Sequence, residues 1–183
     1  MSKAVMISIK PQWCELIAKK QKTIEVRKTR PKIKTPFKCY IYMTKSNLTG
    51  DKKAYKDRMA GKVIGEFVCD YIEEYSSVQS KIKDCTEYQI SLQKLCEDIH
   101  LSIHEFCSYG NGKPLYGWHI SDLVIYDKPI SLNGFSAEGD CNANEKDCKK
   151  CSYNGGSECL YLEEYTHPIV RPPQSWCYVE VEE

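Results

Sequence analysis

A run of alternating polar and branched apolar residues, from Lys22 to Pro31, constrains the fold of this chain more than any other stretch. Side chains of a β-strand alternate between its two faces, so this run predicts a strand with one apolar side and one polar side. Pro31 should end this strand. A solvated surface strand would show the same alternation. The two faces are Ile24 with Val26 and, opposite them, Thr23, Glu25, Arg27 and Thr29.

Apolar runs and spacings elsewhere predict a mixture of strands and helices. Pro11 suits the first turn of a helix that should extend to Lys20. Ser102 and Glu105 have the spacing of a capping box and predict the start of a short helix. A longer helix should precede it, with a stripe of Tyr88, Leu92, Leu95, Cys96 and Ile99. The expected strands are Ala4–Ile9, Cys39–Met43, Lys62–Tyr71, Tyr116–Tyr126 and a last strand that begins near Trp176.

The length of 183 residues suits one domain over 1–183 that carries two insertions, a helical one at about 76–112 and a cysteine-rich one at about 136–168. No apolar leader and no membrane-length run is found, so we expect a soluble, cytoplasmic, monomeric protein that does not contact a membrane. Eleven cysteines, an odd number, then indicate reduced thiols rather than a disulfide framework.

Five motifs together resemble proteins of the ASCH family, in the PUA-like superfamily, and in particular a subgroup common in bacteria and their phages. The first runs from Ile9-Lys10-Pro11 to Lys22-x-x-Glu25-x-Arg27. The resemblance implies an α+β fold, a small mixed β-barrel with packed helices and a cleft beside the first helix that acts on RNA, nucleosides or modified bases. The other motifs are Gly61–Phe67, Tyr116–Leu123, Tyr126–Pro129 and Pro172–Val179.

Charge is distributed unevenly along the chain although its net value is only +1. Residues 1–62 hold 17 Lys or Arg against 4 Asp or Glu, whereas the remainder holds 9 against 21. A basic N-terminal third can steer a phosphate-bearing partner to one face. The acidic remainder could equally neutralise it across the fold.

The cysteine-rich insertion has the clearest spacing for a cofactor. Four thiolates can close a tetrahedral structural zinc site, and Cys-x2-Cys is a common way to place two sulfurs on one ion. Zinc would supply folding energy that the polar insertion cannot obtain from burial. Free thiols or disulfides are the alternative, and His167 could replace one thiolate. The predicted ligands are Cys141, Cys148, Cys151 and Cys159.

The first functional hypothesis is a module that binds RNA or a modified nucleoside. Cations would contact phosphates, Glu25 would accept hydrogen bonds from a base edge or orient Arg27, and Trp118 would form an aromatic wall of the cleft. Tyr42, in the strand after the lysine-rich stretch, could also stack on bases. His119 is assigned no firm role. The expected ligand-binding residues are Lys10, Arg27, Lys28, Thr29, Arg30, Tyr42, Trp118 and Ser175.

The second hypothesis is a hydrolase that uses Lys22 and Glu25. Some ASCH relatives are amidohydrolases of acetylated cytidine and use a Lys-x-x-Thr motif, but Glu25 occupies the threonine position here, so the hydroxyl nucleophile is missing. Other relatives are ribonucleases, for which Lys22, Tyr42 and Ser175 are the residues to consider. A Lys22–Glu25 ion pair could instead order the strand. The third hypothesis is a protein-interaction module built on the cysteine-rich and acidic parts.

Overall fold

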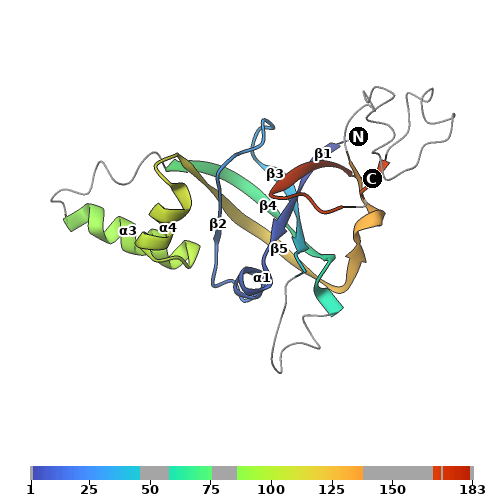
Figure 1. Ribbon diagram of the computed structural model, residues 1–183, viewed down its shortest axis with the longest axis horizontal. Coiled ribbons are helices and arrows are strands. Elements are labelled where there is room, and N and C mark those ends of the chain that lie inside the picture. The colour runs from blue at the N-terminus through green and yellow to red at the C-terminus, as the bar shows by residue number, and fades with distance from the viewer. Residues whose placement is uncertain (1, 46–57, 76–85, 138–166, 170, 182–183) are drawn as a thin grey trace.

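The computed structural model describes residues 2–45, 58–75, 86–137, 167–169 and 171–181 (Figure 1). Its helices are α1 (Pro11–Ala18), α3 (Thr86–Ile99) and α4 (Ile103–Gly110), with a 3-10 turn, η2 (Leu132–Gly134). The strands are β1 (Ser2–Ile9), β2 (Ile24–Arg27), β3 (Phe37–Met43), β4 (Lys62–Tyr75), β5 (Leu115–Ser131), β6 (Ser136–Ala137), β7 (His167–Pro168) and β8 (Trp176–Val181). No helix among these residues is long and apolar enough to cross a membrane.

The strands form one mixed sheet in the order β2-β5-β4-β3-β1-β8-β6-β7. Strands β1 and β3 run parallel, and the long strands β4 and β5 pair antiparallel with three register shifts that bend the sheet. Gly65 lies at one of these irregular places, where a Cβ would collide with the Val124 carbonyl. Glycine is the residue that permits such a close backbone approach within a strand.

The sheet is open and not a closed barrel, which corrects the expected architecture. Strands β2 and β7 end the described order and do not pair with each other. Side chains nevertheless join distant parts of the curved sheet: Arg27 Nη2 on β2 donates to the Ser8 carbonyl on β1 at 2.5 Å. Trp176 on β8 donates from Nε1 to Thr29 Oγ1, in the loop after β2, at 3.0 Å.

Apolar residues on both faces of β1 are buried, which explains the continuous apolar run in this stretch. Val5 and Ile7 belong to the main core with Trp118, and α1 adds Cys14 and Ile17 to that core. Ala4 and Met6 face a second cluster on the other side. Helix α1 begins at Pro11, as predicted, and ends two residues before the predicted Lys20, which has a positive φ of 57°.

Helices α3 and α4 lie at one end of the sheet beside β2 (Figure 1). The capping box of α4 is confirmed: Ser102 accepts a hydrogen bond from the Glu105 backbone, and the Glu105 carboxylate accepts one from the Ser102 backbone. Ile24 and Val26 of β2 pack with Ile99 and Phe106 of these helices. The expected helical insertion therefore covers the apolar face of β2.

Candidate functional site

Lys22, just before β2, and the polar face of β2 form a buried charge cluster of Lys22, Glu25 and Arg27. The predicted alternation is confirmed, but this face is not open to water: Lys22 is 3% exposed and Glu25 is 4% exposed. Lys22 Nζ lies 3.5 Å from Glu25 Oε2, and Arg27 Nη2 lies 3.2 Å from Glu25 Oε1. One carboxylate is therefore shared between two cations.

Lys22 also contacts the helical insertion. Its Nζ donates to the Ile99 carbonyl at the end of α3 at 2.6 Å and lies 5.4 Å from the centre of the Trp13 ring. A cation at the C-terminus of a helix is favoured by the unpaired carbonyls there. Burial lowers the pKa of Lys22, and the neighbouring Glu25 carboxylate opposes that change. This arrangement gives Lys22 a positioning role between β2 and α3.

An exposed basic segment follows the cluster, on the loop from β2 to β3. Lys28, Arg30, Lys32 and Lys34 are all exposed. None of the four forms an ion pair with another residue that the structure describes. Their charge is consequently available to a ligand, in contrast to that of Lys22.

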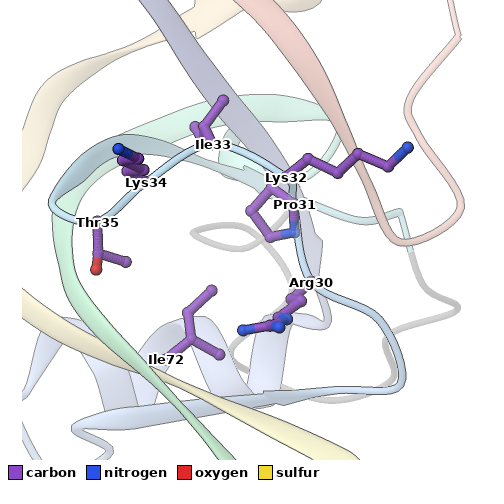
Figure 2. Close-up of a pocket in the computed structure, with 7 residues that line it drawn as sticks. All are labelled: Arg30, Pro31, Lys32, Ile33, Lys34, Thr35 and Ile72. Carbon is purple, nitrogen blue, oxygen red and sulfur yellow. The ribbon is translucent and has the colours of Figure 1, made fainter.

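The basic segment borders a pocket of 620 Å³ (Figure 2). Arg30 and Lys34 provide charge, while Ile33 of the loop and Ile72 of β4 are half-buried apolar residues of its wall. The Lys32 side chain extends away from the pocket (Figure 2). Ligand pockets of proteins commonly occupy about 300–1,000 Å³, so the size suits a small group such as one nucleotide.

The remaining predicted ligand residues are divided between several places. Lys10 is exposed at the N-cap position of α1, and the Ser175 carbonyl accepts a hydrogen bond from the Ser8 backbone N–H beside Arg27. Tyr42 is 3% exposed in the second core cluster, on the opposite side of the sheet from the main core, so the structure does not bring it to Lys22. The proposed stacking surface on Tyr42 is therefore inaccessible.

Trp118 is a core residue and not the expected wall of a binding cleft. It is 0% exposed and packs edge-on against Phe37, with ring centres 5.8 Å apart, and lies 6.0 Å from Trp176. Long-range packing of β3 and β8 over the same face of β5 buries it. His119, its neighbour, faces the other way and stacks on the exposed Tyr71 at 3.7 Å. Burial lowers the pKa of His119, and the nearby Glu73 carboxylate opposes this change.

Three residues near the basic segment were not predicted as site residues: Ile72, Tyr116 and Tyr109. Arg30 lies over the Tyr116 ring at 5.6 Å, and Lys28 lies over the Tyr109 ring at 4.8 Å. Tyr116 opens one of the family-like motifs, so its position could have been a signal. Nothing local indicated Ile72 or Tyr109, because β4 and α4 reach the loop only through tertiary packing.

The predicted zinc ligands lie outside the described residues, as does most of the cysteine-rich insertion, so this site stays a prediction. No group of three or more His, Cys, Asp or Glu side chains suited to a metal is found within the part of the chain that the structure describes.

Comparison with solved structures identifies the fold of this chain. No protein-family model matches the chain, and no curated protein matches it. The crystal structure of ASCH from Zymomonas mobilis superimposes with a TM-score of 0.55 at 17% identity, over 97% of this chain and 87% of that one. The chain has an ASCH fold. A tyrosine-to-phenylalanine variant of the same protein gives 0.56 at 17% identity, over 98% and 91% of the two chains.

The ASCH fold confirms the resemblance drawn from the sequence motifs at the level of architecture. The match extends over nearly the whole chain. At 17% identity, this similarity establishes the fold but not the role of any individual residue. The functional site is therefore inferred from the geometry of this chain.

Proposed function

We propose that this protein is an RNA-binding module whose main contact is the basic segment between β2 and β3. The observation that carries the proposal is that Lys28, Arg30 and Lys34 are exposed and lack ion pairs among the described residues, and that Arg30 and Lys34 border one pocket. Exposed Lys and Arg side chains of this kind bind phosphate groups. The ASCH architecture, which is PUA-like, supports RNA as the phosphate-bearing polymer.

Salt dependence tests this proposal directly. If three cations each neutralise one phosphate, the slope of log binding constant against log salt should be about −2 for a single strand. Labelled RNA should therefore bind tightly at low salt and weakly at moderate salt in an anisotropy titration. Each sample is afterwards run on a denaturing gel, so that binding and cleavage are read together.

Replacing Arg30 by Ala should weaken RNA binding and reduce the magnitude of the salt slope by about 0.7, because one phosphate contact is lost. The matched control is Lys19→Ala, which removes an exposed cation that is paired with Glu15 on α1. An unchanged slope in the Arg30 variant, or no RNA binding by the native protein, would contradict the proposal. In the latter case a panel of nucleosides, including acetylated cytidine, is the next set of ligands to measure.

A second candidate function is hydrolysis of RNA or a nucleoside through Lys22. The observation in its favour is that burial lowers the pKa of this lysine while Glu25 lies 3.5 Å away, a pairing that can hold an amine for proton transfer. Its burial argues against it, since a substrate must displace the end of α3 to reach Nζ. Shortened RNA on the denaturing gel, absent with a Lys22→Met variant that remains folded, would support the hydrolase.

A further inference from the structure

The pocket beside the basic segment combines charge with an apolar wall, which a simple phosphate clamp does not need. Ile33 and Ile72 are half-buried and pack against the main core; Ile72 presents its outer side to the pocket, and the Ile33 side chain extends away from the enclosed space (Figure 2). Figure 2 shows the guanidinium of Arg30 and the side chains of Thr35 and Ile72 directed toward the space enclosed by the loop. A ligand that fills it should have one flat apolar part and one anionic part.

The loop that forms the pocket is held at several points. The Lys32 backbone N–H donates to the Tyr178 hydroxyl at 2.7 Å, and the Thr29 hydroxyl accepts from Trp176 Nε1. Pro31 is buried. These contacts attach the loop to β8 on the far side of the sheet order from β2, so the pocket is largely formed before a ligand arrives.

Aromatic rings extend the surface beyond the pocket. Arg30 belongs to the pocket and also lies over Tyr116, while Lys28 lies over the exposed Tyr109. Lys28 and Arg30 are two residues apart, so the chain separates them by at most about 7 Å. Cations interleaved with aromatic rings are the arrangement that binds backbone phosphates and unstacked bases of single strands.

We propose that this surface recognises unpaired RNA, seating one unstacked nucleotide in the pocket with its base against Ile72 and its phosphate on Arg30 and Lys34. The next phosphate along the strand reaches Lys28. Bases in a duplex are stacked and present only their edges, so a duplex cannot place a base in this pocket. The inference rests on the proposed function, and it specifies the ligand as a single strand with a displaced base.

Glu74 marks the limit of this surface. It is exposed and directly opposite Tyr116 in the β4–β5 register, so the two side chains share one face of the sheet. A carboxylate there repels phosphate, so we expect the RNA strand to run from the pocket toward Lys28 rather than past Tyr116 to Glu74.

The test compares two variants with the same change of charge. Lys34→Glu places a carboxylate at the pocket, and Lys128→Glu places one at an exposed site twelve residues from Tyr116 along β5, a strand path of about 40 Å. Each is titrated with an unpaired RNA oligonucleotide and with the same sequence held in a hairpin stem. We expect Lys34→Glu to lose at least tenfold in affinity for the unpaired RNA, and Lys128→Glu less than threefold.

A third variant, Ile72→Ser, probes the apolar wall. It should weaken unpaired RNA binding without changing the salt slope, because no phosphate contact is removed; a melting curve checks that it remains folded. Equal native affinity for the unpaired and stem RNA would overturn the single-strand inference and leave the RNA-binding proposal standing. Equal losses in the two glutamate variants would overturn the pocket as the binding site and the basic segment as the main contact. Absence of binding to either RNA would overturn both.

Discussion

At the scale of single residues, the same type of side chain has two different roles within twelve positions. Lys22 is buried, shares Glu25 with Arg27 and holds the end of α3, whereas Lys34 is exposed beside a pocket. Burying two cations and one anion is costly unless each has partners. The buried cluster is therefore best understood as part of the fold, and the exposed cations as the part that meets a ligand.

The shared carboxylate predicts unequal effects of two substitutions on stability. Glu25→Gln leaves Lys22 and Arg27 buried without their anion and should lower the free energy of unfolding by about 3–5 kcal/mol. Lys22→Met keeps the Glu25–Arg27 pair and loses mainly the bond to the Ile99 carbonyl, so it should cost about 1–3 kcal/mol. Urea unfolding measures both, with Lys19→Ala as the surface control. A larger loss for Lys22→Met than for Glu25→Gln would contradict this account.

At the scale of elements, the helical insertion is attached to the sheet through the start of β2. Thr23 makes two contacts with Asp98 in the last turn of α3: its backbone N–H donates to the Asp98 carbonyl at 3.1 Å, and its hydroxyl donates to Asp98 Oδ1 at 3.0 Å. Lys22 adds the bond to Ile99. The position of α3 therefore depends on polar contacts as well as on the apolar packing of Ile24 and Val26.

Substituting Thr23 by Val tests this attachment. The hydroxyl contact is lost while the backbone contact remains, and a bond of this kind contributes about 0.5–1.5 kcal/mol. Hydrogen exchange of the α3 and α4 amides should become several-fold faster, whereas β1 and β3 amides should keep their protection. The control is Ser121→Ala, which removes a comparable hydroxyl contact to Asp70 between β5 and β4. Equal acceleration throughout the sheet would show that α3 is not a separately attached unit.

At the scale of the whole molecule, the sheet is open at β2 and at β7, and side chains provide the long-range connections that a closed barrel would make with backbone hydrogen bonds. The basic segment lies where these connections meet. Its pocket is lined by the β2–β3 loop and by Ile72 of β4, and β5 lies between β2 and β4 in the sheet, so the pocket forms only when these strands have paired.

The zinc prediction also concerns the whole molecule. We expect one zinc ion per chain, held by Cys141, Cys148, Cys151 and Cys159, which should be detected by elemental analysis of the purified protein. Removal of the metal by a chelator should lower the melting temperature, because structural zinc contributes folding free energy. Cys148→Ser should abolish zinc content, and Cys107→Ser, at a described free thiol on α4, should leave it unchanged. Zinc-free native protein would contradict the prediction.

The sequence by itself determined the local features: the alternation of Ile24, Glu25, Val26 and Arg27, the start of α1 at Pro11 and the Ser102–Glu105 capping box. Each depends on residues near in the chain. The tertiary structure alone decided that Lys22 and Trp118 are buried, that Tyr42 faces away from Lys22, and that Ile72 and Tyr116 join the basic segment. The reason is that accessibility is set by which distant strands and helices cover a face, and alternation along one strand cannot report that.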